Sequence, residues 1–260
     1  MRIALHQTVG HPGDVAANLA EAEAAAARAA EAGAGLLVFP ELFLTGYDIG
    51  TDVHALAEPL DGPSHGAMAA TARRHGVALL YGHAERAGDG VYNAARLVGA
   101  DGRPRLDYRK THLYGPGERA LFRPGDRLAP VVEIGGLRVG VLICYDVEFP
   151  ETVRSLALAG AELVAVPTAL PAPTPAVPNL LVPARAWENQ VFVAYADRCG
   201  RERTLGFEGL STVAAPDGTV LARAGAEPAL LLAEIEPGRF AGSRARNPYL
   251  ADRRPELYRG

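Results

Sequence analysis

The sequence has very little lysine and very little cysteine. Of its 260 residues only Lys110 is a lysine, whereas 25 are arginine, and the cysteines are Cys144 and Cys199. A chain that begins with strand-like apolar residues rather than a secretion signal predicts a cytoplasmic protein, in which a structural disulfide is not expected. No apolar run approaches the roughly 20 residues that span a bilayer, which argues against a membrane protein. The lone lysine raises the question of where a compact ammonium is needed instead of a planar guanidinium.

Several functional motifs are absent as well. The seven histidines are scattered without an HExxH pattern, and paired cysteine clusters are lacking, so no metal site is expected. Neither a GxxxxGK[ST] loop nor a GxGxxG turn between a strand and a helix occurs, so no nucleotide cofactor is expected. The net charge of −4 argues against nucleic acids and anionic membranes as partners.

What the sequence does contain is an alternation of apolar strands and helices. Asp14 is a good N-cap for an alanine-rich helix over 15–32, and 35–39 is an apolar run typical of a strand covered on both faces. With 48% hydrophobic and 22% charged residues, the chain predicts one domain over 1–260, with mixed sheets and helices in a layered α/β or α+β fold. The other expected strands are 3–8, 77–81, 92–99, 106–110, 137–144, 163–167 and 191–196, the other expected helices are 64–75, 150–159 and 184–189, and a late hairpin turns at 216–218.

The proline-rich segment 170–178 is the one break in composition. Four of its nine residues are proline. One interpretation is a stiff connection on the surface. Because the segment follows the end of a predicted strand, the other interpretation is a wall or lid of a pocket.

Three stretches place reactive side chains at the ends of buried segments. Glu41 follows the run 35–39, Lys110 ends the segment 106–110, and Cys144 ends the run 137–144. Sites in open α/β sheets are usually assembled at the carboxyl ends of strands. A thiol nucleophile, a carboxylate base, and an ammonium that lowers the thiol pKa and stabilises an oxyanion form a complete set for acyl transfer.

Each of these residues also has an ordinary structural interpretation. Cys144 alone is a small buried hydrophobe, Glu41 alone caps the backbone after Pro40, and Lys110 alone is a solvated surface charge. The joint placement of the three residues, one of which is the only lysine, favours the catalytic interpretation. Spacing along the sequence does not by itself bring them together in space.

The residues around these positions resemble the three signature blocks of the nitrilase (carbon–nitrogen hydrolase) superfamily. The blocks occur in the family's order and with family-like spacing, and they are 39–43 (FPELF), 109–113 (RKTHL) and 144–151 (CYDVEFPE). The resemblance covers essentially the whole chain and implies an αββα sandwich with a catalytic triad of Glu41, Lys110 and Cys144. Glu118 takes the place of the family's second glutamate, although read alone it is a carboxylate on a loop surface. The implied reaction is amide hydrolysis through a cysteine thioester, with the oxyanion between the lysine ammonium and the backbone N–H of Tyr145.

Within the superfamily, the sequence around the site most resembles the short-chain aliphatic amidases typified by 5-aminopentanamidase. Relatives that bind a substrate carboxylate tend to carry arginine near position 148, whereas this chain has Glu148, and an acidic pocket wall favours a cationic substrate tail. The resemblance therefore implies a small ω-amino or ω-guanidino alkyl amide. Tyr47 is the candidate for packing along the alkyl chain, and Tyr145 and Thr168 are further candidate substrate contacts. The alternative for Glu148 is a structural ion pair with Arg154.

Other assignments remain open at this point. A nitrilase would release the same acid from a nitrile, although Tyr145-Asp146 after the cysteine, instead of Trp-Glu, favours an amidase. An N-carbamoyl amine amidohydrolase would use the same triad, and a non-catalytic binding protein would keep the scaffold without turnover. The segment 170–178 departs from the 5-aminopentanamidases, so the substrate's chain length or head group can differ. Because homodimers are common in the superfamily and larger assemblies occur, we expect a homodimer or a higher homo-oligomer.

Overall fold

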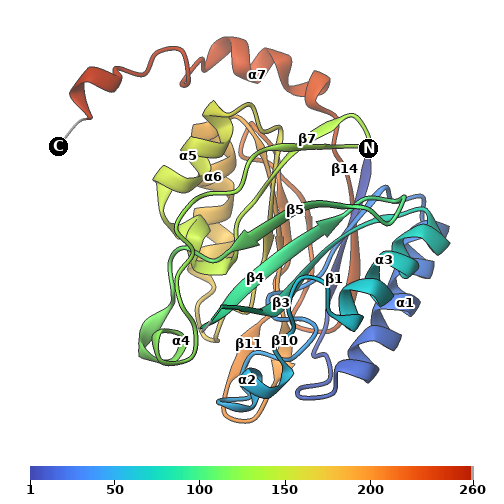
Figure 1. The fold of residues 1–260 in the computed structure, drawn as a ribbon. Helices are drawn as coiled ribbons and strands as arrows, with labels where there is room; N and C mark the ends of the chain where they lie inside the picture. The colour runs from blue at the N-terminus through green and yellow to red at the C-terminus, as the bar shows by residue number, and fades with distance from the viewer. Residues whose placement is uncertain (89, 259–260) are drawn as a thin grey trace.

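The computed structural model describes residues 1–88 and 90–258, which form two facing six-stranded mixed sheets (Figure 1). The first sheet has the order β14-β1-β2-β3-β4-β5, with β14 (Ala229–Glu234), β1 (Arg2–Gln7), β2 (Leu36–Val38), β3 (Ala78–Ala87), β4 (Gly90–Val98) and β5 (Pro104–Arg109). The second has the order β13-β12-β9-β8-β7-β6, with β13 (Val220–Arg223), β12 (Thr212–Ala214), β9 (Phe192–Ala196), β8 (Leu163–Pro167), β7 (Leu137–Val141) and β6 (Val132–Ile134). A separate hairpin pairs β10 (Cys199–Arg201) with β11 (Gly206–Glu208).

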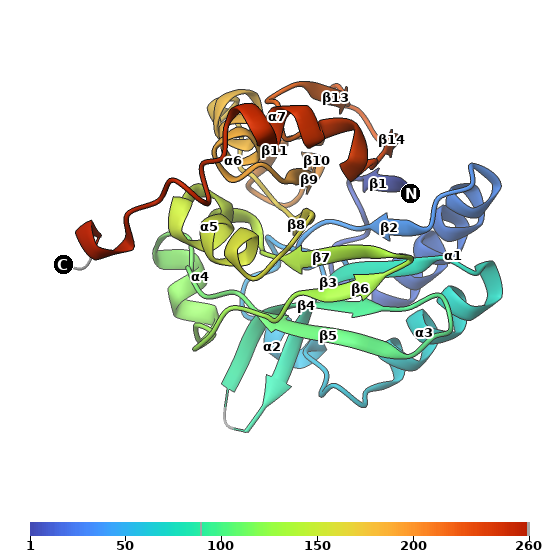
Figure 2. The ribbon, with the colours of Figure 1, turned by 90° about the horizontal axis from the view of Figure 1, so that it is seen from above.

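Helices cover the outer faces of both sheets. α1 (Val15–Glu31) and α3 (Pro63–His75) lie on the first sheet, and α5 (Pro150–Leu158) and α6 (Val182–Asn189) lie on the second (Figures 1 and 2). The layers therefore follow the order helix, sheet, sheet, helix, and the expected αββα sandwich is confirmed. The shorter helical elements are α2 (Asp52–Leu56), α4 (Gly115–Leu121), α7 (Ala241–Arg246), the 3₁₀ turns 144–148, 237–240 and 255–257, and the π-helical turn 177–181.

The main core lies between the two sheets. Leu5 and Val38 from the first sheet and Val141 and Val164 from the second are all fully buried there. The central strands of each sheet run parallel, whereas the outer pairings are antiparallel. Parallel strands that are covered on both faces have to be apolar throughout, which is why such runs could be located in the sequence.

The alanine-rich helix α1 begins and packs as its sequence predicts. The side chain of Asp14 accepts a hydrogen bond from the amide of Ala17 at 2.9 Å, which confirms the predicted N-cap. Apart from Asn18, the buried face of the helix consists of small side chains, which allow it to lie close against the first sheet: Ala22, Ala25, Ala26 and Ala29.

The expected strand over 137–144 is shorter than predicted. β7 ends at Val141, and Cys144 begins a 3₁₀ turn instead of ending a strand. The reason is the side chain of Asp146, which accepts a hydrogen bond from the amide of Ile143 at 3.1 Å and so turns the chain before the strand continues. The cysteine is thereby placed on a turn just beyond the strand.

The last part of the described chain leaves the body of the fold. After α7 it projects past α5 and α6, away from both sheets (Figures 1 and 2). Within residues 1–88 and 90–258, no helix combines the length and the apolar character needed to cross a membrane.

Candidate active site

The three predicted catalytic positions meet where the two sheets face each other. Glu41 follows β2 and Lys110 follows β5 in the first sheet, whereas Cys144 follows β7 in the second. The Nζ atom of Lys110 lies 2.7 Å from Oε1 of Glu41, and both side chains are fully buried. Cys144 is 5% exposed and lies close enough to both for their charges to shift its pKa. The structure therefore brings the carboxylate, the ammonium and the thiol together.

Glu41 is presented by a tight turn. The next residue, Leu42, has a φ of 48°, in the left-handed region that residues other than glycine rarely adopt. The turn lies directly on Gly82 of β3, where an added Cβ atom would be 2.3 Å from the Leu42 nitrogen, so only glycine permits this approach. Asn93 of β4 donates to Oε1 of Glu41 at 2.6 Å. The other oxygen, Oε2, has no hydrogen-bond partner within the described part of the chain.

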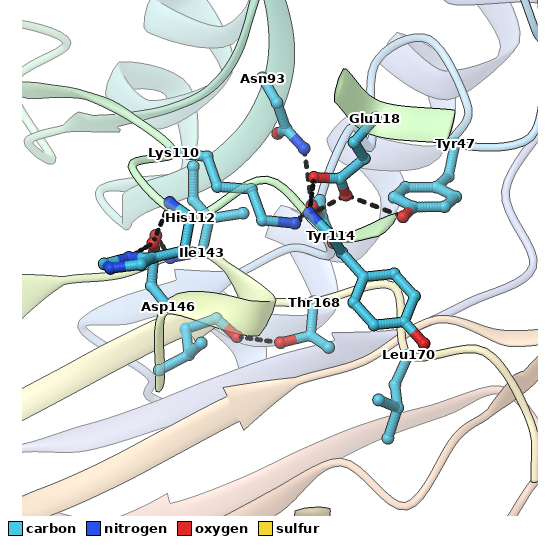
Figure 3. Close-up of polar contacts among 12 residues, drawn as sticks. Tyr47, Asn93, Lys110, His112, Tyr114, Glu118, Ile143, Asp146, Thr168 and Leu170 are labelled. Atoms are coloured by element: carbon cyan, nitrogen blue, oxygen red, sulfur yellow. Dashed lines mark hydrogen bonds and ion pairs between the residues drawn. The ribbon is translucent and has the colours of Figure 1, made fainter. Parts of the chain in front are cut away.

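Cys144 also lies on a strained turn, with a φ of 45°. Asp146, two residues later, is fully buried and connects this turn to the segment that carries the lysine. It accepts hydrogen bonds from the hydroxyl groups of Tyr108 at 2.8 Å and Thr111 at 2.9 Å. It also accepts the backbone amide of His112 at 2.9 Å (Figure 3). Asp146 thereby fixes the lysine segment relative to the cysteine turn.

Glu118 joins the group from α4. Its Oε1 atom accepts hydrogen bonds from Nζ of Lys110 at 2.7 Å and from the hydroxyl of Tyr47 at 2.8 Å, which reach it from opposite sides (Figure 3). Its Oε2 atom accepts the amide of Tyr114 at 2.8 Å. Glu118 is 5% exposed, so the alternative of a carboxylate on a loop surface is wrong. These donors compensate the burial of the charge.

Burial and mutual charge set the protonation states of the cluster. Burial raises the pKa of Glu41 to about 7, because desolvation, together with the charge of Glu118, outweighs the opposing effect of Lys110. Burial opposes the charge on Lys110 as well, but Glu41, Cys144 and Glu118 hold its pKa well above the ordinary value. Burial and the charge of Glu41 raise the pKa of the Cys144 thiol far more than Lys110 lowers it. At neutral pH the thiol therefore keeps its proton, beside a carboxylate suited to accept it.

The positive charge at the centre of this cluster is that of Lys110, which lies 2.7 Å from each of the two glutamates. Among the described residues, no three or more histidine, cysteine, aspartate or glutamate side chains are grouped in a way that could hold a metal ion.

A cavity of about 490 Å³ opens beside Glu118. The aromatic side chains of Tyr47 and Tyr114 line this cavity, and so does Pro171 of the proline-rich segment. The amide of Ala172 donates to the carbonyl of Gly206 at 2.9 Å, which attaches this segment to β11. Of the two interpretations of segment 170–178, the structure therefore favours a pocket wall.

The predicted substrate contacts differ in their surroundings. Tyr47 lines the cavity. Tyr145 is half-buried, and its ring meets that of Tyr114 edge-on, with the centroids 5.2 Å apart. Thr168 is fully buried, and its hydroxyl donates to the carbonyl of Val166 at 3.0 Å, so this hydroxyl is already engaged with the backbone.

Glu148 is half-buried, and its carboxylate has no ion-pair partner among the residues that the structure describes. The alternative pairing with Arg154 is wrong, because the guanidinium of Arg154 donates to the carbonyl of Glu188 at 2.8 Å. Arg185 donates to the backbone carbonyl of Glu148 at 2.6 Å instead. Burial raises the pKa of Glu148, and the charges of Lys110 and Arg185 oppose this shift, so the carboxylate lies within electrostatic reach of the site.

Sequence reasoning missed two residues that contact the Glu41 turn. Asn93 lies within a predicted strand, where a polar side chain between apolar neighbours was the available signal. Arg198 is fully buried and donates to the backbone carbonyls of Glu41 at 3.1 Å and Leu42 at 2.7 Å. An arginine two residues after the buried strand β9 was the signal for its position, but nothing in the sequence indicates its partners.

Comparison with known proteins agrees with this geometry. The family model described as carbon-nitrogen hydrolase matches residues 2–245. A protein of Pseudomonas protegens named "Hydrolase in pqqF 5'region" is 49% identical over 99% of this chain and 90% of its own length. An (R)-stereoselective amidase of a Pseudomonas species is 40% identical, with 98% and 92% covered. A nitrilase of Pyrococcus abyssi is also 40% identical, with 93% and 92% covered.

A solved structure gives the same result. The amidase of Nesterenkonia sp. AN1 has a TM-score of 0.86 and 40% sequence identity, with 99% of this chain and 98% of that chain covered. The similarity thus includes both sheets, the helices outside them and the turns that carry the site. The chain therefore belongs to the carbon-nitrogen hydrolase family of the nitrilase superfamily, in its amidase branch, whose members hydrolyse amide bonds other than peptide bonds.

Proposed function

We propose that this protein hydrolyses a small aliphatic primary amide to the carboxylic acid and ammonia, with Glu41, Lys110 and Cys144 as its catalytic triad. The observation that carries the proposal is the buried contact between Lys110 and Glu41 beside Cys144, in which the pKa of Glu41 is raised to about 7. A carboxyl group with this pKa is able both to accept and to return a proton near neutral pH.

In the first half of the reaction, Glu41 accepts the thiol proton through its unpartnered Oε2 atom while the sulfur of Cys144 attacks the carbonyl carbon. The ammonium of Lys110 and the backbone N–H of Tyr145 stabilise the resulting oxyanion. Protonated Glu41 then gives its proton to the leaving nitrogen, so that ammonia departs and a thioester remains. In the second half, Glu41 removes a proton from water, the oxygen attacks the thioester, and the acid leaves as the thiol regains its proton.

Glu118 tunes this proton transfer electrostatically. It holds the Lys110 ammonium at 2.7 Å, and its negative charge contributes to the raised pKa of Glu41. Tyr47, whose hydroxyl donates to Glu118, connects the catalytic cluster to the cavity wall. Glu118 is therefore proposed as the fourth member of the catalytic group.

The substrate is proposed to be an ω-amino or ω-guanidino alkyl amide. The amidase of Nesterenkonia sp. AN1 has been solved as one variant in complex with butyramide, and as another variant with the acetamide moiety of fluoroacetamide on its active-site cysteine, which supports a small aliphatic amide here. Asp48 and Glu118 line the cavity, and Glu148 lies within electrostatic reach of the site. These carboxylates favour a cationic tail. Tyr47 packs along the alkyl chain, and Tyr145 and Thr168 complete the proposed contacts.

A panel of primary amides with cationic, neutral and acidic tails tests this function by ammonia release. Wild type is expected to turn over cationic amides with roughly tenfold higher kcat/KM than neutral ones, and Cys144→Ala is expected to release no ammonia from any of them. Glu148→Gln should reduce the preference for cationic tails, whereas Glu151→Gln, on the exposed surface of α5, should retain it. Faster turnover of neutral or acidic amides would contradict the substrate class and leave the amidase proposal intact.

A nitrilase is the second candidate, because one of the relatives carries that name at 40% identity. Paired nitrile and amide substrates with the same alkyl chain distinguish the two activities by ammonia release. An N-carbamoyl amine amidohydrolase would instead release a free amine and carbon dioxide together with ammonia. A non-catalytic binding protein predicts that mass spectrometry detects no acyl-enzyme at Cys144 with any of these substrates.

We also propose that the protein forms a homodimer or higher homo-oligomer in the cytoplasm. Leu158 and Trp187, on α5 and α6, are exposed, as are Leu257 and Tyr258 in the projecting chain after α7. Exposed apolar side chains on two neighbouring helices and on the projecting chain favour a second copy that covers them. Sedimentation velocity tests the assembly, and a monomer at micromolar concentration would contradict it, whereas cell fractionation tests the location.

A further inference from the structure

We infer that the buried ion pair between Arg198 and Glu202 positions the proposed general base: Arg198 holds the turn that presents Glu41, and Glu202 holds the chain that follows this turn. The inference rests on the proposed function, because it takes Glu41 as the base. Arg198 follows β9 in the second sheet, whereas Glu41 follows β2 in the first. The pair therefore joins the two sheets at the site.

The guanidinium of Arg198 donates to two backbone carbonyl groups at this turn. Its Nε atom donates to the carbonyl of Glu41 at 3.1 Å, and Nη2 donates to the carbonyl of Leu42 at 2.7 Å. Nη1 reaches the carbonyl of Val9 at 3.2 Å. Because a guanidinium presents its donors in fixed directions, these contacts fix the carbonyl groups on both sides of the left-handed Leu42. The direction of the Glu41 side chain depends on that backbone.

Glu202 supplies the other half of the arrangement. It is 2% exposed, and its Oε1 atom lies 2.8 Å from Nη1 of Arg198. Its Oε2 atom accepts the backbone amides of Tyr47 at 2.9 Å and Asp48 at 2.7 Å. One carboxylate thus neutralises the arginine and also holds Tyr47, whose hydroxyl donates to Glu118. The ion pair therefore holds the backbone that presents Glu41, and it also holds the backbone of Tyr47 in the cavity wall.

A buried ion pair need not add stability, because apolar side chains of similar volume often serve a fold as well. A second buried arginine, which does not contact the Glu41 turn, allows a positioning role to be distinguished from a purely structural one within this chain. Arg96 of β4 is 7% exposed, lies 2.5 Å from Asp107 of β5, and donates to the carbonyl of Leu60 at 2.7 Å. These contacts resemble those of Arg198 in kind, but none of them involves the Glu41 turn or the cavity beside Glu118. Arg96 is therefore the matched control.

The decisive comparison is Arg198→Lys against Arg96→Lys, because both variants keep the charge and lose the fork of donors. We expect Arg198→Lys to lose roughly 100-fold in kcat with little change in KM, as a displaced catalytic group does. We also expect the acid limb of its kcat/KM profile to move to higher pH, because a displaced Glu41 loses the nearby Lys110 charge that lowers its pKa. Arg96→Lys should keep both the wild-type kcat and the wild-type acid limb.

Glu202→Gln provides a second, gentler variant, since glutamine keeps the shape and one acceptor oxygen. It is expected to raise KM several-fold more than it lowers kcat, because the amides of Tyr47 and Asp48 lose a charged acceptor. Thermal melting followed by circular dichroism confirms that each variant is folded before its kinetics are compared. A Glu202→Gln variant with unchanged KM and kcat would contradict its role.

The rate at which iodoacetamide alkylates Cys144, measured against pH, provides a readout that needs no substrate. It should rise through the ionisation of Glu41 in wild type, and this rise should move to higher pH in Arg198→Lys and stay in place in Arg96→Lys. A folded Arg198→Lys with wild-type kcat and alkylation profile overturns the inference, and so do equal changes in both lysine variants. If wild type hydrolyses no amide while Arg198→Lys alone shifts the alkylation profile, the proposed function fails and the positioning role stands.

Discussion

The Nζ atom of Lys110 donates a hydrogen bond to Oε1 of Glu41 at 2.7 Å, with both side chains fully buried. The same ammonium donates to Glu118 at 2.7 Å. One cation thus serves two carboxylates, and the pKa of Glu41 is raised to about 7 while that of Lys110 is held well above its ordinary value. Near neutral pH, the proton on Glu41 is therefore exchangeable and the proton on Lys110 is retained.

Replacing Lys110 with arginine is expected to leave the fold intact and to lower kcat by roughly 100-fold or more. The planar guanidinium is bulkier than the ammonium and directs its donors differently, so it does not fit between the two glutamates. Ammonia release and thermal melting check this expectation. Arg109→Lys, which exchanges the neighbouring cation in the opposite direction, serves as the control and should stay active. Near-normal turnover of Lys110→Arg would mean that the single lysine is an accident of composition.

Glu118→Gln is expected to move the acid limb of kcat/KM to lower pH. Glu41 has to be ionised to accept the thiol proton, so activity rises with pH through its pKa of about 7. The negative charge of Glu118 raises that pKa, and glutamine removes this charge while keeping the side chain's shape. Activity profiles between about pH 5 and about pH 8 check the shift. An acid limb that stays in place or moves upward contradicts the electrostatic role of Glu118.

The two cysteines are expected to react very differently. Cys144 is 5% exposed, whereas Cys199 is fully buried, and burial raises its pKa to about 11. Iodoacetamide at neutral pH should therefore modify native protein once, at Cys144, because Glu41 lies beside this thiol to accept its proton during the attack, whereas Cys199 is not accessible to the reagent. Mass spectrometry of the intact protein counts the adducts, and native Cys144→Ala should carry none. Two adducts on native wild type would contradict this expectation.

Two buried histidines are expected to make the protein sensitive to acid. The rings of His65 and His83 meet edge-on with centroids 4.6 Å apart, and burial lowers the pKa of both, that of His83 most strongly. Below the unfolded histidine pKa of about 6.5, both histidines bind a proton in the unfolded chain but stay neutral in the native state. The free energy of unfolding therefore falls as pH falls. The slope reaches about 1.4 kcal/mol per pH unit for each histidine that stays neutral.

Urea unfolding of wild type and His83→Gln at about pH 7 and about pH 5 measures this effect. The variant has no imidazole at position 83, so it should lose less of its free energy of unfolding between the two conditions. An equal loss in both proteins would show that His83 takes up its proton without unfolding.

The parts of the fold that the sequence predicted well are those determined by local pattern and full burial. β8 was predicted with the observed bounds, Leu163–Pro167, because a strand covered on both faces is apolar throughout. The strand β14 (Ala229–Glu234) was not predicted, because it forms an edge through pairing with β1, more than 200 residues away. The helix α4 was missed because Gly115, Pro116 and Gly117 at its start are typical of a turn, so only the family resemblance placed Glu118 in the site.

The candidate site could be predicted only as far as its reactive side chains. Glu41, Lys110 and Cys144 are recognisable because each follows a buried strand and carries a reactive group. Arg198 and Glu202 could not be assigned in this way, because their contacts depend on how the second sheet docks onto the first. Glu148 illustrates the same limit, since the alternative of an ion pair with Arg154 fails because Arg154 donates to a backbone carbonyl instead.

The origin of the proposed base and nucleophile in different sheets has a consequence for folding. Glu41 and Lys110 belong to the first sheet and Cys144 to the second, so a species in which either sheet has formed alone is catalytically silent. Recovery of activity after dilution from denaturant would then follow the docking of the two sheets, whereas circular dichroism would follow the formation of each. In a refolding experiment that records both signals, the return of activity therefore reports the rate at which the two sheets dock.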